Sequence, residues 1–217
     1  MEKLHNLIKG HKEFKELHFK NFEVDFDNLV KNGQSPEVLF IGCCDSRVVP
    51  DLITGSKPGD LFILRNVGNF VPPFKGDNDF HGTAAAIEYA VSILNIKHII
   101  VCGHTYCGAC EALFKEMKDD DESVHIKKWL ELGKKSKDFV IKNFAHLPKE
   151  SMLRTTEQIS IIFQLENLMT YPGVKRRVEE GSLTVHGWYY KLEDGSIEYY
   201  DTEELEFRNL GSNKYKQ

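Results

Sequence analysis

Two short motifs in this sequence carry side chains suited to holding a metal ion. The first is Cys43-Cys44-Asp45-Ser46-Arg47, and the second is Gly103-His104-Thr105-Tyr106-Cys107-Gly108. Cys43, His104 and Cys107 offer two thiolates and one imidazole, a donor set typical of zinc. Three protein ligands leave the fourth position of a tetrahedral ion open, which is the pattern of a catalytic zinc rather than a structural one.

Asp45 and Arg47 add a second kind of chemistry beside these ligands. An extended backbone alternates its side chains, so Asp45 is expected on the same side as Cys43. The guanidinium of Arg47 can grip that carboxylate at two points and keep it ionised. We therefore expect Asp45 to orient the water or hydroxide at the open position. A zinc-stabilised scaffold without turnover, the alternative from outside enzymology, would gain nothing from such a pair.

Apolar runs precede both motifs and predict the strands that position them. In an open parallel sheet the carboxyl ends of the strands lie side by side, and ligands bind there. Strands are expected at residues 37–42, 60–64, 97–102, 183–190 and 197–200. Helices are expected at residues 1–32, 51–55, 83–94, 108–118, 124–144 and 148–169, with a break at 171–173.

Strands that alternate with helices predict an α/β fold, in which a mostly parallel central β-sheet is flanked by helices. A turn at residues 193–196 predicts a C-terminal β-hairpin at the sheet edge. The whole chain, residues 1–217, is expected to form a single domain with an N-terminal helical arm at 1–33. The arm is rich in Phe and must bury these side chains either on its own domain or across a partner subunit.

Composition excludes several classes of protein. With 41% hydrophobic and 28% charged residues, the chain resembles an ordinary globular protein, and its net charge of -5 gives no reason to expect nucleic acid. No apolar run approaches the roughly 20 residues needed to cross a membrane. The N-terminus lacks the pattern of a secretory signal, so a cytoplasmic location is expected. Five cysteines in such a chain favour metal or catalytic roles over a disulfide framework.

The run Cys107-Gly108-Ala109-Cys110 also matches a thioredoxin-like redox pair, because it follows a strand and opens a helix. That alternative leaves Cys43, Asp45 and His104 without a role. We expect Cys110 to be a packed thiol, and we expect Cys102 and Cys44 to lie in the core.

Taken together, the motifs resemble the signature of the β-class carbonic anhydrases. Further runs are similar to that family: Arg65-Asn66-Val67-Gly68-Asn69, Pro72-Pro73, Ala86-Ile87-Glu88-Tyr89-Ala90 and Val185-His186-Gly187-Trp188-Tyr189-Tyr190. The resemblance implies a carbonate dehydratase, a zinc lyase that reversibly hydrates CO₂ to bicarbonate and a proton through zinc-bound hydroxide. It implies one Zn²⁺ per chain, held by Cys43, His104 and Cys107, with Asp45 and Arg47 as the catalytic dyad.

The same resemblance implies a substrate pocket for CO₂ and bicarbonate. Gln34, Phe62 and Tyr89 match pocket residues of the plant-like subclass, in which they come from the neighbouring subunit, and Gly108 matches a backbone position beside the zinc water. A homodimer or a dimer of dimers is therefore implied.

Two departures bear on this assignment. Phe40 stands where a bicarbonate-inhibited bacterial subclass has Trp, which argues against that subclass although Arg65 is present. Cys44 replaces the usual Ser and raises the question of which neighbouring thiol binds zinc. Within enzymes, a hydrolase for a CO₂-like molecule such as carbon disulfide could use the same site.

Overall fold

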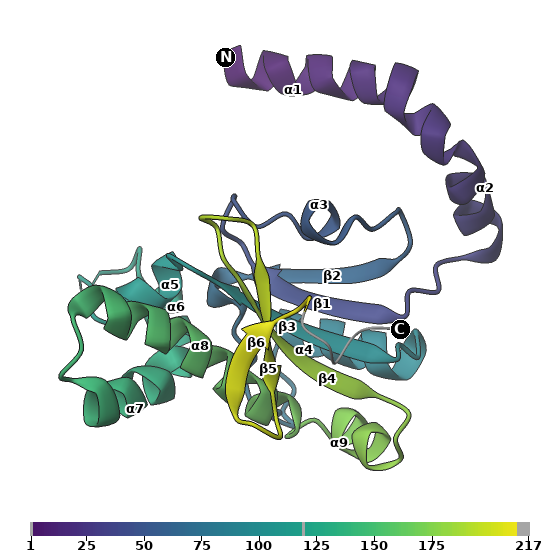
Figure 1. Ribbon diagram of the computed structural model, residues 1–217. Helices are drawn as coiled ribbons and strands as arrows, with labels where there is room; N and C mark the ends of the chain where they lie inside the picture. Colours follow the sequence, from purple (N-terminus) through teal and green to yellow (C-terminus); the bar gives the residue numbers. More distant parts are fainter. Residues whose placement is uncertain (1, 119, 212–217) are drawn as a thin grey trace.

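The protein, described here from a computed structural model over residues 2–118 and 120–211, is built around a six-stranded sheet (Figure 1). Its strand order is β2-β1-β3-β4-β5-β6. The strands are β1 (Val38–Cys43), β2 (Leu61–Asn66), β3 (His98–His104), β4 (Thr184–Tyr190), β5 (Ile197–Asp201) and β6 (Glu206–Asn209). Strands β1 to β4 pair in parallel, and β5 and β6 pair antiparallel at one edge. The predicted α/β fold is confirmed, and the edge hairpin carries one strand, β6, that the sequence does not predict.

Helices flank the sheet and form the arm. The arm contains α1 (Glu2–Glu13), the π-helical turn η1 (Phe14–His18), the 3₁₀ turn η2 (Phe19–Phe22) and α2 (Glu23–Asn32). The first half of the body adds α3 (Pro50–Thr54), η3 (Val67–Asn69), α4 (Gly82–Glu88), η4 (Tyr89–Ile93) and α5 (Gly108–Ala112). The second half adds α6 (Val124–Leu130), η5 (Glu131–Gly133), α7 (Lys134–Phe144), α8 (Lys149–Leu168) and α9 (Pro172–Glu179).

Several predicted boundaries differ from those in the structure. The break expected at residues 171–173 does occur, but it covers residues 169–171 between α8 and α9, and the helix α9 was not expected. It begins at Pro172, because proline at the first helical position needs no N–H partner. The helix expected at 108–118 ends at Ala112. Strands expected to stop at residues 42 and 102 continue to Cys43 and His104, so both side chains stand on the last residue of a strand.

The two faces of the sheet bury different apolar clusters. One face carries Leu39, Ile41, Ile99 and Val101, which pack against side chains of α4, η4, α8 and α9. The opposite face carries Phe40, Ile100 and Cys102, with Ile53 of α3 packed against them. Consecutive residues of β1 and β3 thus point to opposite faces, and both faces are apolar, as expected for buried parallel strands. A third cluster, around Phe70, Leu113 and Leu130, lies next to Cys43 and Cys107.

Helix α8 approaches the sheet closely at two glycines. A Cβ at Gly103 of β3 or at Gly187 of β4 would come within 2.8 Å of the Ile161 side chain. Ile161 of α8 is fully buried and packs over both glycines. Without side chains at these two positions, α8 can lie near the carboxyl ends of β3 and β4, where the candidate site is found.

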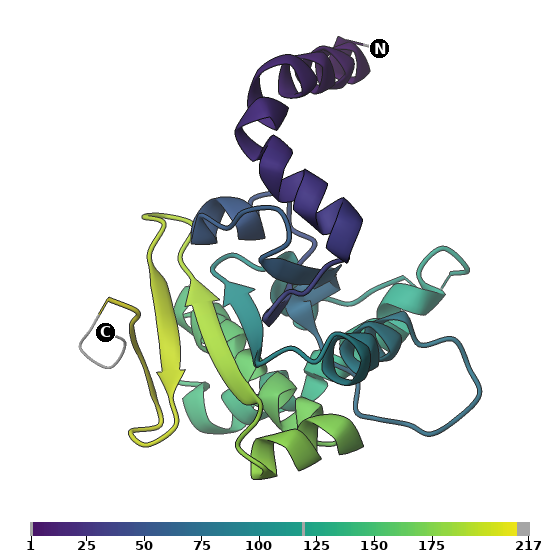
Figure 2. The same ribbon diagram turned by 90° about the vertical axis from the view of Figure 1, so that its right-hand side faces the viewer.

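The N-terminal arm curves away from the body (Figures 1 and 2). None of residues 2–32 is buried, and Leu29 approaches the body beside Gly59. Large apolar side chains are therefore open along its length: Leu4, Leu7, Ile8, Leu17, Val24 and Val30 are each more than half exposed. Of the two expectations for the arm, packing on its own domain is wrong.

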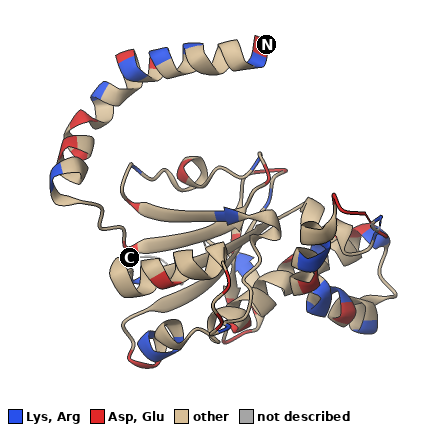
Figure 3. Cartoon of the chain, turned by 180° about the vertical axis from the view of Figure 1, so that it is seen from behind, with Lys and Arg blue, Asp and Glu red and all other residues tan. Residues whose placement is uncertain are grey.

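Charged residues of both signs are spread over the chain (Figure 3). Basic and acidic segments both occur along the arm and on α6–α8 (Figure 3). Within residues 2–118 and 120–211, no helix combines the length and the apolar character required to cross a bilayer.

Candidate metal centre

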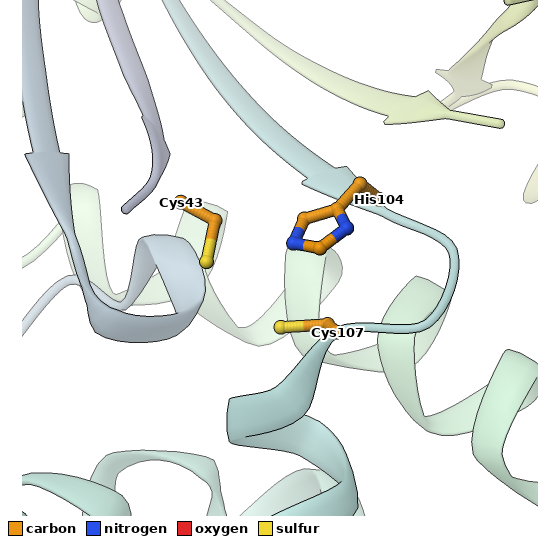
Figure 4. Close-up of side chains that lie close together, drawn as sticks. All are labelled: Cys43, His104 and Cys107. Carbon is orange, nitrogen blue, oxygen red and sulfur yellow. The ribbon is translucent and has the colours of Figure 1, made fainter. Parts of the chain in front are cut away.

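The three predicted ligands lie together at the carboxyl end of the sheet. Cys43 ends β1, His104 ends the neighbouring parallel strand β3, and Cys107 caps the start of α5 three residues later. Their ligand atoms all lie within 4.8 Å of one another. The three side chains point toward a common centre (Figure 4), and all three residues are buried, with at most 5% of their surface exposed.

The imidazole of His104 is prepared to bind a cation. Its Nδ1 lies 2.8 Å from the carbonyl oxygen of Thr105, an arrangement that fixes the proton on Nδ1 because a carbonyl only accepts. Its Nε2 is then a bare acceptor, and it is buried with no hydrogen-bond partner among the described residues. A buried acceptor without a donor is costly, and a metal ion satisfies it.

Backbone donors converge on the sulfur of Cys43. The N–H groups of Asp45 and Gly68 donate to Cys43 Sγ, with N···S distances of 3.4 and 3.3 Å. Gly68 adopts φ 79°, and a Cβ there would lie 2.8 Å from the Cβ of Ala109. Trp129 Nε1 donates to the carbonyl of Val67 at 2.7 Å and holds this turn in place. These donors favour the thiolate form of Cys43.

Without a cation between them, the neutral thiol forms of Cys43 and Cys107 are favoured. The pKa of the Cys43 thiol is raised to about 12, mainly by contact with the Cys107 thiol and secondly by burial. The pKa of the Cys107 thiol is also raised, mainly by contact with Cys110 and less by burial. A divalent cation reverses these shifts because it stabilises both thiolates at once. The donor set, the bare Nε2 and the sulfur pair all fit a zinc ion.

Asp45 and Arg47 are clamped to each other beside this cluster. Arg47 Nε donates to Asp45 Oδ1 at 2.9 Å and Arg47 Nη2 to Oδ2 at 2.7 Å, and the Arg47 backbone N–H adds a third bond to Oδ1 at 3.0 Å. These bonds hold the pKa of the Asp45 carboxyl well below its usual range. The side chain of Asp45 is 16% exposed, so an ionised acceptor faces the edge of the site.

Arg65 is occupied by the backbone that carries the dyad. Its Nε donates to the carbonyl of Cys43 at 3.0 Å, and its Nη2 donates to that of Asp45 at 2.8 Å. Arg65 thus supports the turn after β1.

Phe40 is fully buried and meets the ring of Trp188 edge-on, with centroids 6.4 Å apart.

Two of the predicted pocket residues, Phe62 and Tyr89, lie away from this chain's own cluster. Register pairs Phe62 with Leu39 and Asn66 with Cys43, so Phe62 lies four residues, roughly 13 Å, from the level of Cys43. The ring of Tyr89 stacks on Phe62 with centroids 5.9 Å apart. Phe62 and Tyr89 therefore lie together toward the amino end of the sheet, opposite the cluster, and Gln34 comes four residues before β1 enters that end.

Gly108 does lie beside the cluster, as the first residue of α5. A Cβ added there would meet no atom within 4 Å, so space is open next to its backbone.

The other cysteines divide differently from expectation. Cys102 and Cys110 are buried, as predicted. Cys44 is exposed, so the prediction that it lies in the core is wrong. Strand β1 ends at Cys43, and strand alternation therefore no longer applies to Cys44. Its side chain is not part of the three-residue ligand cluster.

One buried acid beside the cluster is absent from the sequence predictions. Glu157 of α8 is 2% exposed, and its Oε1 accepts the backbone N–H of Cys107 at 3.0 Å. Burial raises the pKa of this carboxyl to about 7, against the lowering effect of the Tyr189 hydroxyl. Glu157 is 50 residues away from Cys107 in the sequence, and no local motif links the two residues. The sequence therefore gives no reason to select Glu157.

Comparisons with known proteins agree with this geometry. A family model described as Carbonic anhydrase matches residues 38–197. A carbonic anhydrase from Synechocystis sp. is 40% identical over 198 residues, covering 91% of this chain and 71% of that protein. The structure of the β-carbonic anhydrase CcaA matches with a TM-score of 0.91 at 38% identity, covering 98% of this chain and 94% of that one. A structure described among two tetrameric β-carbonic anhydrases from Sordaria macrospora matches with a TM-score of 0.81 at 27% identity, covering 97% and 98% of the two chains.

Proposed function

Because this chain belongs to the carbonic anhydrase family, as a β-class member, we propose that Cys43, His104 and Cys107 hold one zinc ion at which CO₂ is hydrated. The chain is a carbonate dehydratase and interconverts CO₂ and bicarbonate. The observation that carries the zinc assignment is the buried cluster of two sulfurs and one bare imidazole nitrogen.

Zinc held by Cys43, His104 and Cys107 would supply Lewis acidity, which would lower the pKa of a water at the open position. The chain's own groups then orient the reactants. The ionised Oδ atoms of Asp45 accept a hydrogen bond from the attacking oxygen and fix its direction. Arg47 keeps Asp45 deprotonated and immobile through its two-point grip. The open space beside the backbone of Gly108 gives the reactants room.

We further propose that the substrate pocket is completed by a second copy of the chain, as in the plant-like subclass. Phe62 and Tyr89 lie at the wrong end of the sheet to serve their own cluster, and Gln34 comes four residues before β1 enters that end. Gln34 would donate to a CO₂ oxygen, and the stacked Phe62 and Tyr89 would exclude water. Because Arg65 is engaged with backbone carbonyls, it supports this subclass over the bicarbonate-inhibited one.

The arm supports the same assembly. Its exposed apolar side chains need a partner, and residues 1–33 are proposed to cross onto the second copy. The Sordaria macrospora relatives are tetramers, so a dimer of dimers is the natural extension. A fully active monomer in sedimentation would remove this proposal.

The zinc assignment is tested by stopped-flow CO₂ hydration on protein of measured metal content. We expect about one zinc per chain and a hydration rate that scales with zinc occupancy across chelated and reloaded samples. A chelated protein with undiminished hydration would contradict the assignment. Carbon disulfide offered to the same samples separates a hydrolase of that substrate from a carbonic anhydrase.

Subunit sharing is tested by mixing two defects. We expect Gln34→Ala and Asp45→Asn homodimers each to be impaired at both sites. In a heterodimer isolated through two affinity tags, one site inherits both defects and the other inherits none. Its CO₂ hydration should therefore return to about half the wild-type rate. A heterodimer no faster than the mean of its parents would place Gln34 and Asp45 of one chain in the same site.

A further inference from the structure

Side chains of helix α8 contact the loop between His104 and Cys107. Glu157 Oε1 accepts the backbone N–H of Cys107 at 3.0 Å and Arg154 Nη2 at 2.7 Å, and Glu157 Oε2 accepts the Tyr189 hydroxyl at 2.7 Å. Three donors thus converge on one buried carboxylate. Cys107 is the N-cap residue of α5 and has an extended backbone. Because its N–H is bonded to Glu157, the backbone of Cys107 is held in place, and this fixes the direction in which its sulfur points.

Arg154 acts on the preceding residue of the same loop. Its guanidinium lies 4.0 Å from the centroid of the Tyr106 ring. Tyr106 adopts φ 57°, a left-handed conformation that a bulky residue rarely takes without support. Arg154 Nε and Nη1 are buried without hydrogen-bond partners among the described residues, and the guanidinium contacts the Tyr106 ring and Glu157.

The strained residue connects this contact to the dyad. The carbonyl oxygen of Tyr106 accepts Arg47 Nη2 at 3.1 Å, and the same Nη2 donates to Asp45 Oδ2 at 2.7 Å. A change in the Tyr106 backbone would therefore redirect Arg47 and, through it, Asp45. The ion pair of α8 thus contacts both parts of the site. Glu157 bonds to the ligand residue Cys107, and Arg154 reaches the Asp45–Arg47 dyad through Tyr106.

We infer that Glu157 and Arg154 are positioning residues, with Glu157 setting the place of the Cys107 sulfur and Arg154 setting the orientation of the Arg47–Asp45 pair. This inference rests on the proposed zinc site. A purely structural ion pair would affect only folding stability. The two roles differ in what they touch, so substitutions should separate metal retention from turnover.

Helix α8 itself provides a matched control. Gln164, fully buried, accepts the backbone N–H of Val71 at 2.8 Å, in the same way that Glu157 accepts that of Cys107, but its target is not one of the three clustered ligands. Glu157→Ala and Gln164→Ala each remove one buried acceptor from α8. Glu157→Gln keeps an oxygen for the Cys107 N–H while losing the charge that pairs with Arg154.

The test measures zinc release to a chelator, the absorption spectrum of the cobalt-substituted protein, and kcat and KM for CO₂ hydration. We expect Glu157→Ala to release zinc about 10- to 100-fold faster and to shift the sulfur-to-cobalt bands. Glu157→Gln should fall between Glu157→Ala and wild type, and Gln164→Ala should match wild type in both readouts even where its stability is lower. Equal zinc release from Glu157→Ala and Gln164→Ala would overturn the role of Glu157.

Arg154→Gln provides a second arm, because Arg154 is partly exposed and its replacement need not compromise folding. We expect it to lower kcat at unchanged zinc content, with KM little altered. An unchanged kcat would overturn the role of Arg154. A wild-type protein that binds no zinc would defeat the proposed function itself, whereas wild-type zinc binding with unaffected variants would defeat only this inference.

Discussion

Replacement of Cys107 by Ser is expected to remove both the zinc ion and the activity of this protein. A serine hydroxyl stays protonated where a cysteine in contact with a cation becomes a thiolate, so the site loses one anionic ligand. We expect zinc content to fall from about one per chain to a small fraction, and CO₂ hydration to fall by about a thousandfold or more. Metal analysis and stopped-flow rates on the same samples measure both effects.

Cys110→Ser is the matched control for that substitution. Cys110 lies three residues further along, in α5, is equally buried, and is not one of the three clustered ligands. The Cys110→Ser variant should retain zinc and CO₂ hydration activity. The thioredoxin-like alternative makes the opposite demand, since insulin-disulfide reduction would then depend on Cys110. Full zinc and full activity in Cys107→Ser would show that the ligand set is wrong.

The centre of this fold was predictable because its chemistry sits at strand ends. Parallel strands bring their carboxyl ends together, so two motifs about 60 residues apart were expected to meet, and Cys43 and His104 do so on neighbouring strands. The two-point grip of Arg47 on Asp45 follows from a separation of two residues. Local sequence was sufficient wherever the partners were close along the chain or fixed by sheet geometry.

Partners supplied from elsewhere in the fold were not predictable. Glu157 and Arg154 occur in a helix whose pattern gives no reason to single out one acid or one base, and their targets are about 50 residues away. The exposure of Cys44 depends on the residue at which β1 ends, and a shift of one residue reverses the expectation. The destination of the arm depends on a second copy of the chain, which one sequence does not describe.

Asp45→Asn is expected to separate metal binding from turnover. The substitution preserves size and leaves the three ligands untouched, so zinc content should stay at the wild-type level. It replaces one carboxylate oxygen with an amide NH₂, which donates where Asp45 accepts. The attacking oxygen then loses its acceptor, and Arg47 Nη2 faces a donor instead of Oδ2. We expect kcat to fall by about 10²- to 10⁴-fold.

Two further measurements make the Asp45→Asn result specific. The loss should persist at every pH at which wild type is active, because Arg47 holds the pKa of the Asp45 carboxyl so low that the wild-type group is ionised throughout. Asp51→Asn, at an exposed acid of the neighbouring helix α3, should leave the rate unchanged. If Asp45→Asn matched wild type in kcat, the clamped carboxylate would have no part in the reaction, and orientation of the attacking oxygen would have to come from the backbone around Gly108.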